Sequence, residues 1–122
     1  MKREIITIDE YGRLNMPTDT AAIWMTEAEI VELFGTTAAA VHTGIKTILK
    51  GNVLHDYEVC KCIRLDSGNR VGVYNMEVVV SLAFRLNTYP ASVFRKWLVK
   101  TATAPRRTTP PIVIQYKDGL LN

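Results

Sequence analysis

The sequence predicts an α+β fold: a winged helix-turn-helix core with an extra C-terminal helical pair and terminal β-strands. Two amphipathic helical segments are joined by a short turn at Gly35, which is typical of a helix-turn-helix. Alternating residues on both sides of a turn at 66–69 follow, so we expect a hairpin after the second helix, as in the winged version. The chain of 122 residues is long enough for one such domain, predicted at 1–102, followed by a basic, proline-rich linker and terminal strand at 103–122.

The amino-terminal region is predicted to form a short hairpin. Residues 4–8 are rich in β-branched side chains, residues 10–12 supply a turn, and residues 13–16 alternate again. Residues 21–25 are then expected to be extended.

The first of the two central helices has a clear start and end. Thr26 followed by Glu29 is a capping box, in which the hydroxyl and the carboxylate each accept a backbone N–H at the helix start. Ile30 and Phe34 lie on the expected buried face. Gly35 supplies the left-handed conformation that ends a helix.

The second central helix begins with a hydroxyl cap at Thr36 or Thr37. Val41 and Ile45 recur at helical spacing and are expected to anchor it to the core, and residues 51–52 end it. In DNA-binding examples of this pattern, the second helix enters the major groove.

Two predicted strands, 57–65 and 70–74, form the wing. Cys60 and Cys62 share one strand face and are interpreted as reduced apolar side chains, since no Cys or His pair is available to complete a zinc site. Asn75 is expected to cap a third helix that continues to residue 86, and Pro90 to lie in the first turn of a fourth. A strand predicted at 112–116 needs a partner edge, either the amino-terminal hairpin or another copy of the chain.

Charge is distributed unevenly along the chain. Residues 1–60 contain five Lys or Arg and nine Asp or Glu, a net charge of −4, whereas residues 61–122 contain ten and three, a net charge of +7. No acidic residue occurs between Glu77 and Asp118. A polyanion would therefore be held mainly by the second half.

Several motifs resemble the bacterial RhuM family of virulence-associated and mobile-element proteins. They are Ile-Trp-Met-Thr at 23–26, Leu-Phe-Gly at 33–35, Tyr-Asn-Met-Glu-Val at 74–78 and Phe-Arg-Lys-Trp at 94–97. The second half is also similar to amino-terminal domains of phage antirepressors. The resemblance implies a DNA-binding transcription regulator of a mobile element or prophage.

The candidate DNA contacts lie at the start of the second helix, at the wing turn and in the basic carboxyl-terminal half. They are Thr36, Thr37, His42, Thr43, Lys46, Asn69, Arg70, Arg95, Lys96, Lys100, Arg106 and Arg107. Each has a simpler interpretation. Thr37 is first a helix cap, and His42 and Arg70 are as compatible with solvation as with phosphate contact. The basic residues at 95–100 can be the solvated side of a helix, and those at 106–107 a solubilising linker.

The second helix opens with Thr-Thr-Ala-Ala-Ala at 36–40, where RhuM-like chains carry polar and basic residues. Base reading depends on Arg, Lys, Asn and Gln, so sequence specificity is expected to be reduced. Three glutamates in the first helix would also repel DNA if they faced it. The alternative hypothesis is a protein-interaction module, antirepressor-like or an assembly factor, that keeps the fold without reading DNA sequence.

The sequence contains no phosphate-binding glycine loop, metal-ligand cluster or recognisable catalytic motif. We therefore expect a non-enzyme with no cofactor and no metal. No apolar run has the length of a membrane span, and no signal peptide is recognised, so a cytoplasmic protein is expected. Dimeric binding to two half-sites is common for this fold, and a homodimer is expected.

Overall fold

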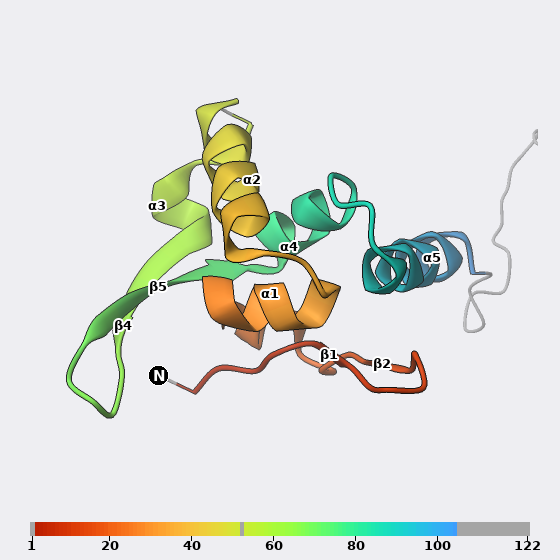
Figure 1. The fold of residues 1–122 in the computed structure, drawn as a ribbon, viewed down its shortest axis with the longest axis horizontal. Helices are drawn as coiled ribbons and strands as arrows, with labels where there is room; N and C mark the ends of the chain where they lie inside the picture. Colours follow the sequence, from red (N-terminus) through yellow and green to blue (C-terminus); the bar gives the residue numbers. More distant parts are fainter. Residues whose placement is uncertain (1, 52, 105–122) are drawn as a thin grey trace, which may run out of the picture.

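The computed structural model describes residues 2–51 and 53–104, and within these residues the chain is an α+β fold with two small sheets (Figure 1). The sequence-predicted strand at 112–116 and most of the linker lie outside the described residues. At the start of the linker, Thr103 is still the last residue of a helix rather than part of a separate segment.

The predicted amino-terminal hairpin is present but short. Strands β1 (Thr7–Ile8) and β2 (Leu14–Asn15) pair antiparallel. The turn is closed by the Asp9 carboxylate, which accepts hydrogen bonds from the N–H groups of Tyr11 and Arg13 at 2.9 Å each. The segment before β1 is joined to the rest of the fold by an isolated parallel bridge between Glu4 and Ile23.

The expected extended segment at 21–25 is only partly extended. A 3₁₀ turn, η1 (Thr20–Ala22), comes first, because the Asp19 side chain caps it by accepting the Ala21 N–H. Strand β3 (Trp24–Thr26) follows and is fully buried.

Helix α1 (Glu27–Phe34) has the predicted capping box. The Thr26 hydroxyl accepts the Glu29 N–H at 3.1 Å, and the Glu29 carboxylate accepts the Thr26 N–H at 2.8 Å. Gly35 ends the helix in the left-handed region, with φ of 58°. Helix α2 (Ala38–Lys50) follows at once and is capped by Thr37, whose hydroxyl accepts the Ala40 N–H at 3.1 Å.

The first strand of the second predicted hairpin does not begin at residue 57 as the alternation suggested. Residues 56–59 form a single helical turn, α3 (Asp56–Val59), in which the N–H groups of Glu58 and Val59 bond to the carbonyl of His55. Four residues are too few to show helical periodicity, and this turn places Val59, fully buried, in the core. Strand β4 (Cys60–Arg64) starts only after it.

The hairpin strands β4 and β5 (Arg70–Asn75) pair antiparallel, and β5 also pairs with β3. The resulting three-stranded sheet has the order β3-β5-β4, so the strand that precedes the helix pair lies beside the last hairpin strand. This pairing ties the hairpin to the start of α1.

Helices α4 (Met76–Ala83) and α5 (Tyr89–Thr103) complete the fold. Asn75 caps α4 as predicted, accepting the N–H groups of Glu77 and Val78, but the helix ends at Ala83 rather than at residue 86. Thr88 caps α5, and Pro90 lies in its first turn.

One core holds the helices together. Phe34 of α1 and Phe94 of α5 meet edge to face with ring centroids 5.7 Å apart, an arrangement favoured for aromatic pairs. The predicted anchors of the central helices are all buried. The core side chains are Ile6, Ile23, Met25, Ile30, Leu33, Phe34, Val41, Ile45, Ile48, Val59, Val78, Val79, Leu82, Ala83, Ala91 and Phe94.

Candidate nucleic-acid interface

The connection between α1 and α2 is a rigid, tight turn. The Thr36 N–H donates to the carbonyl of Val31 at 3.3 Å, which closes the end of α1. The Phe34 carbonyl accepts the hydroxyl of Thr88 at 2.6 Å, so the turn is also attached to the start of α5. With Val41 and Ile45 buried beneath it, α2 is held in one orientation and presents its other face outward.

The outward face of α2 is polar and basic. His42, Thr43, Lys46, Thr47 and Lys50 are exposed, and α2 contains no Asp or Glu. The Thr47 hydroxyl donates to the Thr43 carbonyl at 2.9 Å, while Lys46 and Lys50, one turn apart, make no ion pair among the described residues. This face can offer cationic and hydroxyl groups to an anionic partner.

Two arginines face each other across the hairpin. In the β4–β5 register Arg64 is directly opposite Arg70, at the point where the strands enter the turn, and both are exposed. Neither arginine makes an ion pair with a described residue. Like charges directly opposite on one sheet face destabilise the pairing, so the local structure alone does not account for two cations here.

The turn between the arginines is ordered by its own backbone. The Leu65 N–H donates to the Asn69 carbonyl at 2.7 Å, and the Gly68 N–H donates to the Leu65 carbonyl at 2.8 Å. Gly68 has φ of 92°, a conformation that side chains rarely adopt. The Asn69 N–H is 3.4 Å from the Ser67 hydroxyl. Asn69 thus shapes the turn with its backbone.

A polar contact joins this hairpin to both central helices. Tyr74 lies on the same face of the hairpin as the arginine pair, because alternate residues share a face. Its hydroxyl donates to the Glu27 carboxylate at 3.5 Å, and the same carboxylate oxygen is 3.3 Å from Nδ1 of His42. The Tyr74 end of this hairpin face therefore lies beside the start of α1 and the side of α2 that bears His42, while the arginine pair lies at the turn end.

The environment of this contact suppresses ionisation of the phenol. Burial, followed by the nearby Cys60 thiol and the Glu27 carboxylate, raises the pKa of Tyr74 to about 12. Burial also raises the pKa of the Cys60 thiol, in agreement with the interpretation of this cysteine as a reduced, half-buried side chain. Cys62, in contrast, is exposed.

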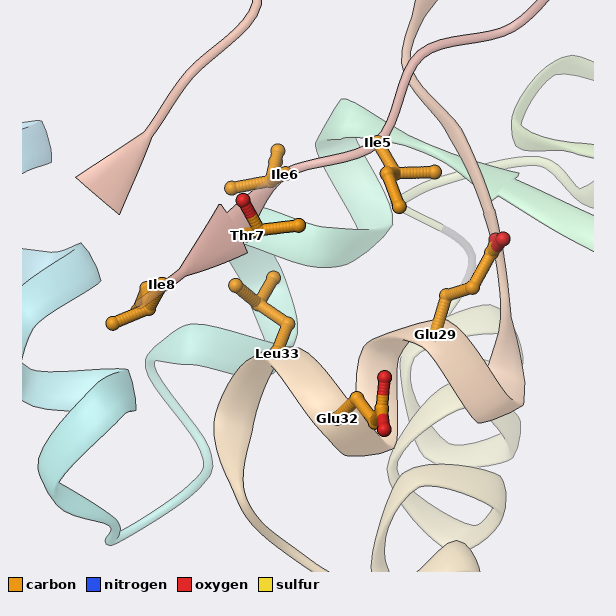
Figure 2. A pocket seen from close by; sticks show the side chains of 7 residues that line it. All are labelled: Ile5, Ile6, Thr7, Ile8, Glu29, Glu32 and Leu33. Carbon is orange, nitrogen blue, oxygen red and sulfur yellow. The ribbon is translucent and has the colours of Figure 1, made fainter. Parts of the chain in front are cut away.

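Two of the three glutamates of α1 make side-chain contacts within the fold. Both carboxylate oxygens of Glu29 accept hydrogen bonds from the Arg3 guanidinium, at 2.7 and 3.0 Å. Burial alone would raise the pKa of Glu29, but the hydrogen bonds from Arg3 and Thr26 outweigh burial and lower it. Glu29 and Glu32 line a depression between α1 and the amino-terminal segment, opposite residues 5–8 (Figure 2). The third glutamate, Glu27, is the partner of Tyr74 and His42.

The basic residues of α5 do not join this surface. Lys96 and Lys100 are exposed on α5, which lies at one end of the molecule's long axis, whereas the hairpin turn lies at the other end (Figure 1). Arg95 is half-buried, and its Nη1 donates to the carbonyls of Ala83 and Leu86 at 2.6 and 2.8 Å. It closes the end of α4, a role that the sequence did not suggest.

The remaining candidates have local or unknown surroundings. Thr37 is the exposed cap of α2, and Thr36 is half-buried in the turn. Arg106 and Arg107 lie outside the described residues. The structure thus brings together His42, Thr43 and Lys46 on α2, and separately Asn69 and Arg70 on the hairpin.

Sequence reasoning missed Arg64, Thr47 and Lys50. The strand register supplies the signal for Arg64, because it is as far from the turn on β4 as Arg70 is on β5. Thr47 and Lys50 lie at helical spacing from Thr43 and Lys46. Lys61 is excluded from the site: its ammonium lies 4.3 Å from the centre of the Trp24 ring, and it belongs to the opposite hairpin face.

No protein-family model, curated protein or solved structure matches this chain. In the described part of the chain, no helix has both the length and the apolar character needed to cross a membrane. Within the same residues, no three His, Cys, Asp or Glu side chains are grouped so that they could hold a metal ion.

Proposed function

We propose that this protein binds double-stranded DNA through a winged helix-turn-helix formed by α1, α2 and the β4–β5 hairpin. In this proposal α2 lies in the major groove, and the hairpin turn contacts the adjacent sugar-phosphate backbone. The resemblance to RhuM-like proteins supports a role as a transcription regulator of a bacterial mobile element or prophage.

The observation that carries the proposal is the Arg64–Arg70 pair. Two like charges held directly opposite on one strand face cost stability, of the order of 0.2–1 kcal/mol for such pairs. A phosphate placed between the two guanidinium groups would turn this repulsion into two charge-assisted contacts. The turn that separates the arginines is closed by backbone hydrogen bonds, which supports the proposal because the two positions keep one register.

The shape and charge of α2 also support the proposal. Its 13 residues span roughly 20 Å, and a major groove about 12 Å wide accepts a single helix. Its exposed face has two lysines, a histidine and two threonines and no carboxylate of its own. Glu29 is paired with Arg3, which reduces part of the repulsion expected from the sequence, whereas Glu27 lies beside His42 and Tyr74 at the proposed surface.

The same face offers little for reading bases. The first turn of α2 exposes Ala38 and Ala39, and the helix has no Arg, Asn or Gln, the side chains that make two-point contacts with bases. Binding would therefore depend mainly on phosphates and change little with sequence. Dimerisation on two half-sites, expected from the sequence, remains part of the proposal and can be measured as the binding stoichiometry.

The test is fluorescence anisotropy with a labelled 20-base-pair duplex over a salt series, using three proteins. These are the wild type, Arg64→Ala/Arg70→Ala, and the matched control Lys96→Ala/Lys100→Ala, which removes the same charge from α5. We expect wild-type affinity to fall steeply with salt, and the hairpin variant to lose about tenfold or more in affinity and to show a shallower salt slope. The α5 variant should stay within about twofold of the wild type.

Two results would reject the proposal. If the folded wild type binds no duplex at low salt, the protein-interaction alternative becomes the better hypothesis. If both double variants lose affinity equally, general positive charge rather than the α2–hairpin surface is responsible. Circular dichroism of each variant verifies that loss of binding is not loss of folding.

A further inference from the structure

A second surface of the molecule combines exposed apolar groups with lysines. Phe84, the residue that ends α4, and Val99, in the last part of α5, have 59% and 57% of their surfaces exposed. Although 15 positions apart in sequence, they line one shallow depression together with Arg95, Lys96 and Lys100. Large apolar side chains exposed together, unlike single ones, mark interaction surfaces.

The charged groups around this depression have one sign. Lys96 and Lys100 line it and are exposed, and neither makes an ion pair with a described residue. No acidic residue occurs anywhere between Glu77 and Asp118. A ligand that covers Phe84 and Val99 must therefore bring its own negative charge to the two lysines.

Charge argues against two nearby occupants. A second copy that docked by the same face would bring two surfaces of the same positive charge together, which disfavours association. The chain's own residues 105–122 carry Arg106, Arg107 and Lys117 against the single Asp118, so they are cationic as well.

Nucleic acid fits this depression poorly. Arg95 directs one nitrogen of its guanidinium at two backbone carbonyls, so this cation is already engaged within the fold. Among the described residues, Phe84 is the one aromatic side chain that lines the depression, whereas sites for single strands stack successive bases on several rings.

We propose that this surface docks an acidic segment of a partner protein, with an apolar side chain seated on Phe84 and Val99 and carboxylates beside Lys96 and Lys100. An amphipathic helix with apolar anchors at helical spacing and flanking Glu residues has this chemistry. Four of the five lining residues belong to α5, which lies at the far end of the long axis from the hairpin turn, so the proposal is independent of DNA binding (Figure 1).

The probe is a labelled synthetic amphipathic peptide with Leu anchors and flanking Glu, together with two matched peptides. One replaces the Leu anchors with Ala, and the other replaces Glu with Lys. The full chain is tested as the wild type, Phe84→Ala, Lys96→Glu/Lys100→Glu and the control Lys46→Glu/Lys50→Glu. This control makes the same charge change at the same i,i+4 spacing on α2. Affinity is measured by anisotropy, and the binding site is mapped by backbone amide chemical shifts.

The expected result is that the wild type prefers the Leu/Glu peptide over both matched peptides. Phe84→Ala should weaken this binding by about fivefold, because the Leu side chain of the peptide loses its contact with the Phe84 ring. Reversal of Lys96 and Lys100 should weaken it by about tenfold and transfer the preference to the Lys peptide. The α2 control should bind the Leu/Glu peptide within about twofold of the wild type, and the largest shifts should lie in α4 and α5.

Other outcomes overturn the proposal. They are no binding of the Leu/Glu peptide at low salt, equal binding of the Leu and Ala peptides, or shifts confined to α2 and the hairpin. Concentration-dependent self-association of the wild type that Phe84→Ala abolishes would assign the surface to a second copy instead. A single-stranded oligonucleotide that shifts the α4 and α5 amides more than the peptide does would assign it to nucleic acid.

Discussion

At the scale of single residues, conformation and environment separate side chains that look alike in sequence. Gly35 and Gly51 both end a helix, but Gly35 has φ of 58° and Gly51 has φ of −73°. Only the first conformation is strained for a residue with a Cβ. Thr36 and Thr37 both resemble caps, yet the hydroxyl of Thr37 is the one that accepts a helix N–H.

Replacement of these glycines should therefore have opposite effects. We expect Gly35→Ala to lower the free energy of unfolding by about 1–2 kcal/mol, because Ala must adopt the left-handed conformation. Gly51→Ala should leave the free energy of unfolding unchanged or raise it by up to about 1 kcal/mol. Alanine adopts the right-handed conformation of Gly51 without strain, and it lowers the conformational entropy of the unfolded chain. Urea denaturation of both variants tests this. Equal effects would show that the turn at Gly35 tolerates a side chain.

The phenol of Tyr74 predicts a specific alkaline response. Its folded pKa of about 12 lies above the ordinary value of 10, so folding favours the neutral phenol. The associated stability is complete below pH 10 and is lost as pH rises from 10 to about 12. Tyr74→Phe should therefore lose less stability than the wild type over this interval in urea melts at each pH. Identical pH dependence of the two proteins would contradict the role given to burial and to Glu27.

At the scale of elements, strand register places charges that the linear sequence leaves apart. Arg64 and Arg70 are separated by a five-residue turn, and the antiparallel pairing makes them direct neighbours. Helix ends are settled in a similar way. Helix α4 stops at Ala83 because the following residues turn back toward α5, where Arg95 binds the carbonyls of Ala83 and Leu86.

A single charge reversal in the hairpin should raise the stability of the fold and at the same time weaken DNA binding. Arg70→Glu replaces a like-charge pair with an opposite-charge pair, so the free energy of unfolding should rise by about 0.5 kcal/mol at low salt. The same change should weaken duplex binding by tenfold or more if the pair contacts phosphate. Urea melts and anisotropy measure the two effects. The double variant Arg64→Glu/Arg70→Glu restores a like-charge pair and should lose the gain in stability.

Arg95 should matter for stability more than its neighbour. Arg95→Ala leaves the carbonyls of Ala83 and Leu86 without their donor, and we expect a loss of about 2 kcal/mol in unfolding free energy. Lys96→Ala, one position along the same helix and exposed, should change it by less than about 0.5 kcal/mol. Thermal or urea denaturation distinguishes them. If Arg95→Ala does not change the free energy of unfolding, the two hydrogen bonds of Arg95 do not stabilise the fold.

At the scale of the whole molecule, the hairpin turn and α5 lie at opposite ends of the long axis, whereas α2 and α4 pack against each other between them (Figure 1). The α2–hairpin surface is joined to the core through Tyr74 and Glu27, and the α4–α5 surface through Phe94 and Arg95. An ordinary salt solution screens exposed charges beyond about 8 Å. The two ligands should therefore bind without competing.

This independence can be measured directly. We expect the affinity for the Leu/Glu peptide to change by less than about twofold when the protein is saturated with duplex at physiological ionic strength. Anisotropy of the labelled peptide, with and without unlabelled duplex, gives the comparison. Displacement of the peptide by duplex would place both ligands on one surface.

The sequence by itself determined the local features. The capping box at Thr26, the left-handed Gly35, the cap at Asn75 and the existence of both hairpins follow from side chains and their near neighbours. Each depends on interactions within a few residues, which a single sequence displays directly. The buried faces of the central helices were predictable for the same reason, since they follow from helical spacing.

Only the tertiary structure decided which charged side chains make hydrogen bonds within the fold and which are exposed to solvent. Arg95 and Lys96 are adjacent in sequence, yet one binds two carbonyls and the other is exposed. Arg64 became a candidate only through its register with Arg70, and Glu29 was removed as a source of repulsion by Arg3, 26 residues away. The turn α3 likewise depends on the core position of Val59. These outcomes depend on contacts between distant segments, and local propensity carries no information about such contacts.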